Sequence, residues 1–236
     1  MPVWNEAEGI KDFITEINAS ISNEAVIFWV VDDFSTDDSV AEITNISNIG
    51  IDVRLLQNYE NMGHGPSTLR ALKAGLDSGA EFILSVDGDG QFLGRDIEKI
   101  LKSLKTSKCD VFEGIRIRHG EPNYRRFTSM MTRTLIWFRV RKWASDANTP
   151  LRAYRSDCLE MLLKDIPENS PIPNLFISAL SRKRNLKIGS MEVLFGDRRG
   201  SQKTGTTWGK SKSYLPSRRF LKFCARATRE WLINKI

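Results

Sequence analysis

The sequence predicts an α/β fold in which a mostly parallel, twisted sheet is flanked by helices. Four short β-rich runs, residues 25–31, 51–56, 82–86 and 110–115, alternate with segments of helical period. Such alternation builds βαβ units, which favour parallel strands. The first run, AVIFWVV, is apolar almost throughout, as a strand covered on both faces requires.

The helices are predicted from apolar residues that recur every three or four positions. This spacing predicts helices over 5–21, 65–76 and 97–104. After Ser145 we expect a loop, DANTPLRAY, then two helices, a strand and a polar loop. The expected ranges are 146–154 for the first loop, 157–164 and 173–180 for the helices, 187–195 for the strand and 196–213 for the polar loop. A last, basic helix is expected from about Pro216.

The start of the chain departs from this plan. It reads MPVWNE, so a proline and a turn-like polar pair lead directly into the first predicted helix. A doubly wound domain normally opens with a strand. We therefore expect either that the sheet lacks its first strand or that the natural chain begins upstream of Met1.

The net charge of +6 is unevenly distributed along the chain. Residues 181–236 hold 15 Lys and Arg against 3 Asp and Glu, whereas residues 1–180 hold 20 against 26. A strongly basic tail favours an anionic partner such as a phosphate, a lipid headgroup or a nucleic acid. A solvated basic face is the alternative, and it explains a smaller surplus better than one of twelve.

The three cysteines, Cys109, Cys158 and Cys224, form no C-x-x-C pair, which argues against both a disulfide framework and a thiolate zinc site. No signal pattern precedes the first helix, and no uncharged apolar run approaches the roughly 20 residues of a membrane helix. We expect a cytoplasmic protein, with peripheral contact at the inner face of the membrane left open.

Polar residues follow the predicted strands, where ligands bind in open α/β sheets. Asp32 and Asp33 end the first strand, in a position typical of carboxylates that contact ribose or base. The second strand leads to NMGHGPSTLRALKAG, whose glycines allow close approach of a phosphate near Arg70. His64 in this segment is equally explained as a residue that begins the helix and has no chemical role.

The third strand ends in SVDGDGQF, in which Asp87, Asp89 and Gln91 alternate along an extended segment. Their side chains point the same way in that geometry. Carboxylate and amide oxygens bind Mg²⁺ or Mn²⁺, usually with substrate phosphates completing the coordination. The alternative is an acidic turn. The other carboxylates at strand ends make the metal site the leading hypothesis.

Five motifs in this order resemble the family 2 glycosyltransferases of GT-A fold, and among them the dolichol- and polyprenyl-phosphate sugar transferases. PVWNEAEGI resembles the family's P-x-x-N-E, and VVDDFSTDDS its V-D-D-x-S-x-D. NMGHGPSTLRALKAG, SVDGDGQF and DANTPLRAYRSD are similar to its glycine-rich helix start, its D-x-D-x-Q and its arginine segment.

The resemblance implies roles for these residues. Pro2, Trp4, Glu6 and Asp33 would hold the base and ribose. Asp87, Asp89 and Gln91 would bind the metal and the diphosphate. Asp146 and Arg152 would face the sugar or acceptor, and basic residues of RRGSQKTGTTWGKSK would contact the acceptor or diphosphate. The segment PLR at 150–152 departs from the family's G-F-R.

The function implied is inverting transfer of a sugar from a nucleoside-diphosphate sugar, with Mg²⁺ or Mn²⁺, to a polyprenyl-phosphate or glycan acceptor. A lipid phosphate needs no general base, whereas a sugar hydroxyl does, and Asp146 is the candidate. Residues 1–195 would form the catalytic domain, and residues 196–236 a basic acceptor loop and an amphipathic helix.

Rival functions stay open. A nucleotidyltransferase would need a basic glycine-rich signature that PVWNE lacks. A nucleic-acid-binding module would need stacking aromatics on a sheet face, and we expect no nucleic acid. An inactive or truncated paralogue acting as a binding protein is the main alternative. The last helix, PSRRFLKFCARATREWLINKI, would either lie in a membrane interface or pack its apolar stripe on the core.

Overall fold

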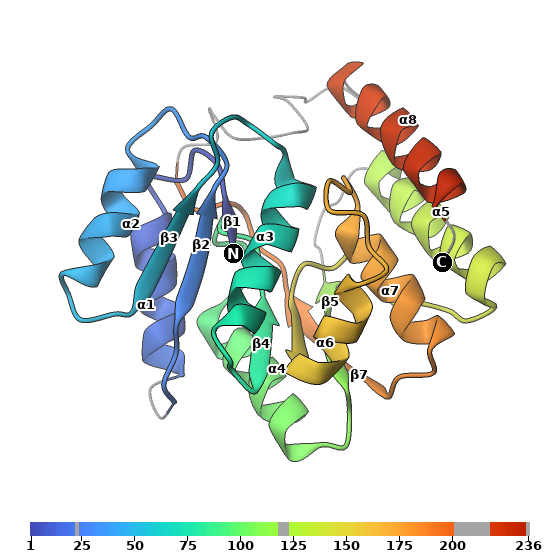
Figure 1. The fold of residues 1–236 in the computed structure, drawn as a ribbon, viewed down its shortest axis with the longest axis horizontal. Coiled ribbons are helices and arrows are strands. Elements are labelled where there is room, and N and C mark those ends of the chain that lie inside the picture. Colours follow the sequence, from blue (N-terminus) through green and yellow to red (C-terminus); the bar gives the residue numbers. More distant parts are fainter. Residues whose placement is uncertain (22–23, 118–122, 201–217, 235–236) are drawn as a thin grey trace.

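The computed structural model describes residues 1–21, 24–117, 123–200 and 218–234 (Figure 1). In these ranges the strands are β1 (Pro2–Val3), β2 (Phe28–Asp32), β3 (Val53–Gln57), β4 (Phe82–Ser85), β5 (Val111–Ile117), β6 (Arg152–Arg155) and β7 (Ile188–Leu194). The helices are α1 (Ile10–Ser20), α2 (Ser39–Ser47), α3 (His64–Asp77), α4 (Gly94–Thr106), α5 (Asn123–Val140), α6 (Ser156–Leu163), α7 (Pro173–Lys183) and α8 (Arg218–Ile233).

The strands form two sheets. The first has the order β1-β2-β3 and is parallel throughout. The second has the order β4-β6-β5-β7, in which β5 and β7 are parallel and β6 runs antiparallel to both of its neighbours. The Gly88 N–H donates to the Pro2 carbonyl at 3.1 Å, which ties the end of β4 to β1. The predicted α/β fold with a mostly parallel sheet is confirmed.

The expectation of a missing first strand is wrong. Pro2 and Val3 form the short strand β1, which pairs in parallel with Val31 and Asp32 of β2. Proline is tolerated there because the pairing with β2 uses the carbonyls on either side of it: the Val31 and Asp33 N–H groups donate to the Met1 and Val3 carbonyls. The sheet therefore opens with a strand, although a minimal one.

Two further elements were not predicted. The segment expected as the loop 146–154 contains β6, which lies between β4 and β5. Helix α5 was not predicted either, because its apolar residues do not lie along one side of a helix. Both elements depend on neighbours that are distant in the sequence.

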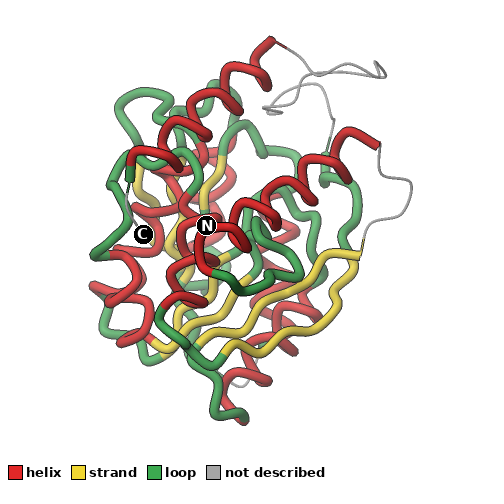
Figure 2. The backbone as a smooth tube through the Cα atoms, turned by 90° about the vertical axis from the view of Figure 1, so that its right-hand side faces the viewer, coloured by secondary structure: helices red, strands yellow, loops and turns green. Residues whose placement is uncertain are grey.

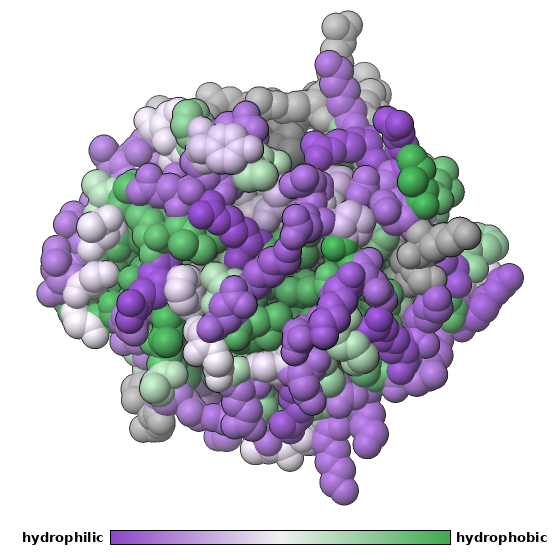
Figure 3. All heavy atoms as spheres, viewed as in Figure 1, coloured by the Kyte–Doolittle hydropathy of each residue, from purple (hydrophilic) through white to green (hydrophobic). Residues whose placement is uncertain are grey.

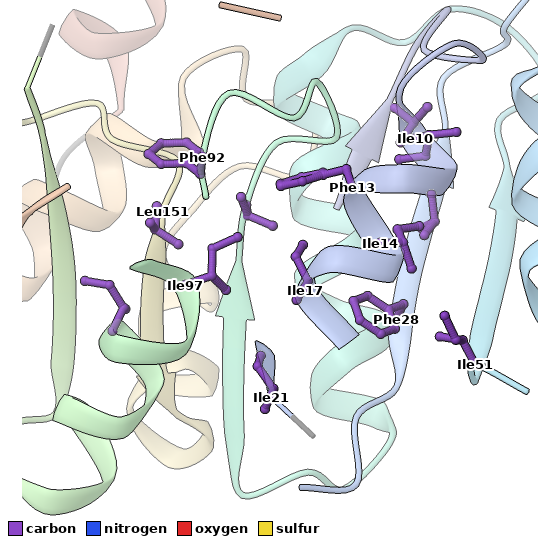
Figure 4. Packing of buried hydrophobic residues seen from close by; sticks show 14 of the residues in the cluster. Ile10, Phe13, Ile14, Ile17, Ile21, Phe28, Ile51, Phe92, Ile97 and Leu151 are labelled. Atoms are coloured by element: carbon purple, nitrogen blue, oxygen red, sulfur yellow. The ribbon is translucent and has the colours of Figure 1, made fainter. Parts of the chain in front are cut away.

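Two hydrophobic cores cover the two faces of the sheets, and Figure 2 shows the strands between helices. The first core joins α1, α2 and α4 to the sheet, with Phe13, Ile14, Ile97 and Phe92 fully buried (Figure 4). The second joins α3, α6 and α7. Alternate strand residues serve opposite cores, as when Leu84 faces the first and Ile83 the second.

The basic C-terminal helix is present as α8, and its apolar stripe packs on the second core. Trp231 is only 3% exposed and lies 5.5 Å from the Phe176 ring, between ring centroids. Phe223 and Ala227 pack against the same core. The core-packing alternative therefore accounts for this stripe. Among the described residues, no helix has the length and apolarity needed to cross a membrane.

Candidate functional site

The carboxyl ends of β1, β2 and β4 converge on one place. The Asp33 N–H donates to the Val3 carbonyl at 2.8 Å, so the segments after β1 and β2 lie side by side. The segment after β4 is held against β1 through Gly88, where a Cβ would stand 2.5 Å from Val3 Cγ2. A glycine is needed at 88 for this approach. The arrangement brings the polar residues after three strands together at one edge.

Asp33 is buried and organises the loop between β3 and α3. Its carboxylate accepts hydrogen bonds from the Asn58 side chain at 2.8 Å and from the backbone N–H groups of Met62 and Gly63, both at 2.9 Å. Gly63 has φ +93°, which a residue with a side chain rarely adopts. Asp33 therefore fixes the shape of the loop in front of α3.

Asp87, Asp89 and His64 form the centre of the site. His64 Nε2 lies 2.8 Å from Asp87 Oδ1. Burial opposes the charged form of His64, but the charge and hydrogen bond of Asp87, with help from Asp89 and Asp33, outweigh it and raise the pKa of His64. Burial also works against the Asp87 carboxylate, and the charge and hydrogen bond of His64 reverse this and lower its pKa.

Asp89 titrates differently. Burial and the charge of Asp87 together raise the pKa of Asp89 to about 7, because two carboxylates share a poorly solvated space. A divalent cation would remove this repulsion, so the pair fits Mg²⁺ or Mn²⁺. Among the residues that the structure describes, no group of three or more His, Cys, Asp and Glu could enclose a metal. A cation held by two carboxylates would keep coordination positions for oxygen atoms of another ligand.

The segment around Asp89 is braced by the residues after β7. Gln91 Nε2 donates to the Gly196 carbonyl at 2.7 Å, and the Arg199 N–H donates to the Asp89 carbonyl at 3.1 Å. Gly90, with φ +70°, leaves room for the Arg199 side chain. The Gln91 amide nitrogen is thereby engaged, and its oxygen is the atom that remains to serve as a ligand.

Asp146 is paired with an arginine that the sequence did not single out. Arg116, at the end of β5, donates from Nε to Asp146 Oδ2 at 2.7 Å and from Nη2 to Oδ1 at 2.8 Å. Both side chains are nearly buried, with 11% and 12% exposed. The charge of Arg116 also helps to lower the pKa of Asp87 and opposes the rise in the pKa of Asp89, so the pair borders the carboxylate centre.

Arg152 does not join this group. Its side chain is fully buried in β6, with Nε 3.3 Å from Glu113 Oε1. Its other nitrogens donate to the Asn174 and Ala147 carbonyls and, at 2.7 Å, to the Ser178 hydroxyl. Glu113 is shared with Arg182, whose Nη2 lies 2.8 Å from Glu113 Oε2. The three charges form a buried ion-pair network under the site rather than a surface that faces a substrate.

The remaining predicted residues lie at the ends of β1 to β3. Pro2 is buried within β1, and Trp4, just after it, is partly exposed. Glu6 is buried and ion-paired with Arg198. Arg70 donates to Asn58 Oδ1 at 2.5 Å and to the Gln57 carbonyl at 2.8 Å. Pro2, Trp4, Glu6, Asp33, Asp87, Asp89 and Gln91 therefore lie in β1 or beyond the carboxyl ends of β1, β2 and β4, whereas Arg70 lies in α3 and Asp146 in the loop between α5 and β6.

Sequence reasoning missed Arg116 as a partner of the site, and it left open whether His64 has a chemical role. For Arg116 the available signal was its place near the end of a predicted strand. Arg198 and Arg199 were expected to meet the acceptor or diphosphate, but they contact Glu6 and Glu16. The rest of the expected acceptor loop, residues 201–212, lies outside the described residues.

The comparisons agree with this architecture. The family model described as glycosyl transferase family 2 matches residues 1–163. An undecaprenyl-phosphate 4-deoxy-4-formamido-L-arabinose transferase of Yersinia enterocolitica is 25% identical over 200 residues, which are 84% of this chain and 60% of that protein. A UDP-N-acetylglucosamine–dolichyl-phosphate N-acetylglucosaminyltransferase of Methanococcus voltae is 21% identical and covers 82% of each chain. The chain spans about 60% of the length of the Yersinia relative.

Solved structures match the fold. Mannosyl-3-phosphoglycerate synthase from Rubrobacter xylanophilus superimposes with a TM-score of 0.60 at 13% identity, over 97% of this chain and 70% of that one. Glucosyl-3-phosphoglycerate synthase from Mycobacterium tuberculosis, in complex with Mn²⁺ and UDP-glucose, gives a TM-score of 0.55 at 18% identity, over 85% and 70%. With the family model matched over more than half of its length, the chain belongs to glycosyl transferase family 2, on a GT-A fold.

Proposed function

We propose that this protein is an inverting glycosyltransferase that moves a sugar from a nucleoside-diphosphate sugar to a polyprenyl phosphate, with Mg²⁺ or Mn²⁺ as cofactor. The observation that carries the proposal is the carboxylate pair Asp87 and Asp89 beyond the end of β4, where burial and the charge of Asp87 together raise the pKa of Asp89 to about 7. Two carboxylates beyond the carboxyl end of a strand can bind a divalent cation together with the oxygen atoms of a diphosphate.

The residues beyond different strands would bind different parts of the donor. Asp33 and the Gly63 turn would shape the pocket for the base and ribose, beside Pro2, Trp4 and Glu6. Asp89, Gln91 and Asp87 would hold the metal, and His64 would fix the Asp87 carboxylate through its Nε2 contact. A bound divalent cation supplies charge that stabilises the departing nucleoside diphosphate. Arg70 would support this pocket through Asn58.

The state of Asp146 favours a phosphate acceptor over a glycan hydroxyl. Both of its oxygens accept hydrogen bonds from Arg116, at 2.7 and 2.8 Å. A carboxylate in a two-pronged pair with a guanidinium is a weak base, because protonation would break the pair. A polyprenyl phosphate is already an anion and attacks without losing a proton. Asp146 would then orient Arg116, whose charge suits an incoming phosphate.

The relatives support the same acceptor class. The Yersinia transferase is named for undecaprenyl phosphate and the Methanococcus protein for dolichyl phosphate. We propose residues 1–195 as the catalytic unit and residues 196–236 as its extension toward the acceptor. A lipid-linked acceptor would bring the protein to a membrane surface, at its cytoplasmic face.

Arg152 has a different role in this proposal from the one its motif implies. Because it is fully buried against Glu113, it would position the segment that carries Asp146 rather than touch the sugar. Its nitrogen donates to the Ala147 carbonyl, the residue after Asp146.

The test is the Asp89→Asn variant, which removes charge at the proposed metal site without changing side-chain size. We expect metal-dependent transfer or hydrolysis of a sugar nucleotide to fall by at least about a hundredfold, with the fold intact by circular dichroism. Asp38→Asn, in the loop before α2, is the matched control and should be fully active. Unchanged turnover by Asp89→Asn, or full activity in excess chelator, would contradict the proposal.

The donor base is identified by thermal shift with UDP, GDP and dTDP, each with and without Mn²⁺. A nucleotide at 100 times its Kd stabilises the folded protein by about 2.7 kcal/mol. We expect one nucleotide to raise the melting temperature, and to do so more strongly with the metal. A protein that binds a nucleotide but turns over no sugar nucleotide would favour the inactive-paralogue alternative.

A further inference from the structure

Helix α5 carries apolar side chains on two opposite sides. Its inner side packs on the second core through Ile136, which is fully buried, with Leu135 and Val140 beside it. Its outer side exposes Met130, which is 55% exposed, and Phe138, which is 62% exposed. A surface helix normally turns polar residues outward, so the outer side of α5 departs from the expected pattern.

The exposed apolar surface extends beyond α5. Trp143, just after the helix, is 51% exposed, and Leu232 and Ile233 at the end of α8 are among the large hydrophobic residues most open to solvent. Arg139 joins the two helices by donating to the Trp231 and Asn234 carbonyls. We call this surface the α5–α8 face and define it by Met130, Met131, Trp137, Phe138, Trp143, Leu232 and Ile233. Figure 3 shows apolar atoms at the surface over α5 and α8, on the right of the molecule.

Basic side chains accompany these residues. The Arg133 guanidinium lies 4.7 Å from the centre of the Trp143 ring, and that of Arg141 lies 4.9 Å from the Trp137 ring. Residues 128–143 contain four Lys and Arg and no Asp or Glu, and residues 222–234 contain three and one. A face with tryptophans, aliphatic residues and an excess of positive charge matches the chemistry of an anionic bilayer surface.

We infer that the α5–α8 face docks on an anionic lipid bilayer, with Trp137, Phe138 and Met130 inserted among the headgroups and Arg133 and Arg141 next to the lipid phosphates. This inference rests on the proposed function, because it supplies the surface from which a polyprenyl phosphate would enter. The inference also moves the expected membrane contact from α8 to α5. The apolar stripe of α8 packs on the second core, whereas the outer side of α5 is exposed.

The position of this face suits delivery of a lipid-linked acceptor. Helix α5 lies in the sequence between β5, which ends next to Arg116, and Asp146, so both partners of the acceptor-side ion pair flank it. Trp143 is three residues before Asp146, a stretch that spans at most about 10 Å. A bilayer on this face would therefore border the Arg116 side of the site.

Nucleic acid fits the same face less well. Binding of single strands depends on ring faces that are open to bases, whereas the rings of Trp137 and Trp143 are stacked by arginines. The aliphatic residues Met130, Leu232 and Ile233 also have no stacking role. These side chains are stabilised more by burial among lipid headgroups and acyl chains than by contact with nucleic-acid bases.

The test is flotation of the whole protein with vesicles of phosphatidylcholine, alone or mixed with phosphatidylglycerol. We expect the wild type to float with the mixed vesicles, and less at high salt because screening weakens the contact with phosphates. The variants Phe138→Ala and Met130→Ala should weaken binding by roughly tenfold each, since each removes most of a large apolar side chain. Ile49→Ala, at a residue just after α2 that is 55% exposed, is the matched control and should float like the wild type.

A second pair of variants tests the charge. Arg141→Gln should lower binding to mixed vesicles and leave the weak binding to phosphatidylcholine unchanged, whereas Arg54→Gln, an exposed arginine in β3, should change neither. Absence of vesicle binding by the wild type, equal loss in Ile49→Ala and Phe138→Ala, or preference for single-stranded RNA over vesicles would overturn the inference. So would a wild-type dimer in light scattering that Phe138→Ala converts to a monomer without any vesicle binding.

The two proposals fail separately. A protein that shows a nucleotide-dependent thermal shift but does not float contradicts only the membrane face. A protein that floats but neither binds nor turns over a sugar nucleotide contradicts only the proposed activity.

Discussion

The carboxylates on the two sides of the site are held in different ways. On the donor side, formed by the ends of β1, β2 and β4, two carboxylates accept from backbone N–H groups: Asp33 from Met62 and Gly63, and Asp89 from Gln91. The other two, Glu6 and Asp87, pair with Arg198 and His64. On the acceptor side, formed by β5, β6 and α7, the partners are arginines, as in the Glu113 and Asp146 pairs.

This difference has a physical consequence. A backbone N–H carries only a partial charge and stays in place when its carboxylate is removed, so the loss is that of hydrogen bonds. A buried arginine that loses its carboxylate keeps a full charge in a poorly solvated space. Equal substitutions should therefore destabilise the protein more at Glu113 or Asp146 than at Asp33 or Asp89.

The largest effect is expected at Glu113. The Glu113→Gln variant removes the carboxylate that pairs with both Arg152 and Arg182, and both arginines are almost fully buried. We expect the free energy of unfolding, measured in urea, to fall by about 3–5 kcal/mol. Glu160→Gln is the control: it breaks the exposed pair with Lys164 and should cost less than about 0.5 kcal/mol. Equal losses in the two variants would remove the distinction between buried and exposed pairs.

The donor side should respond less to the equivalent change. The two oxygens of the Asp33 carboxylate accept three hydrogen bonds. In Asp33→Asn only one oxygen remains to accept them. We expect a loss of about 1–3 kcal/mol in the same urea experiment, together with weaker nucleotide binding. A loss larger than that of Glu113→Gln would reverse the comparison between the two sides.

A loss of stability of similar size is expected where the proposed metal-binding segment packs on β1. In Gly88→Ala the new methyl would lie 2.5 Å from Val3 Cγ2 and 2.9 Å from the Pro2 carbonyl oxygen. Overpacking of this kind costs about 1–3 kcal/mol and should displace Asp87 and Asp89, so that Mn²⁺ affinity falls with stability. In Gly196→Ala the nearest atom is 3.8 Å away, and neither quantity should change. Equal Mn²⁺ affinity in the two variants would show that the packing on β1 does not position the carboxylates.

The smallest change concerns the His64 contact. His64→Gln keeps a nitrogen that can donate a hydrogen bond to Asp87. It removes the imidazole, whose pKa is raised in the wild type. We expect stability within about 0.5 kcal/mol of the wild type, because the side chain is 46% exposed. Activity above pH 6 should remain within a fewfold in a metal-dependent transferase assay. A stability loss as large as that of Asp33→Asn would mean that His64 supports the loop rather than the carboxylate alone.

The sequence predicted the donor side more completely than the acceptor side. Strands β2 to β5, helices α1, α3 and α4, and the residues Asp33, Asp87 and Asp89 after their strands follow from local patterns, because period and turn chemistry are encoded within short segments. The first strand was missed, since two residues are too few to show a period. Residues 201–217 were expected to include an acceptor loop and lie outside the described residues.

On the acceptor side, tertiary contacts override local signals. Arg152 was expected at the site from its motif, yet β6 turns it into the core, where Glu113 lies 39 residues away in the sequence. Helix α5 was not predicted because its apolar residues occupy two sides, and only packing decides which side is buried. The membrane contact was sought in α8, whose apolar stripe instead covers the second core.

The sequence by itself determined the α/β order, the carboxylates at the strand ends and the basic tail, because these depend on periodicity and on the fixed direction of parallel strands. Only the tertiary structure decided which arginine each carboxylate meets and which apolar surface stays exposed. Such choices depend on the burial of charge and of apolar area between segments far apart in the chain. A single stretch of sequence cannot encode them.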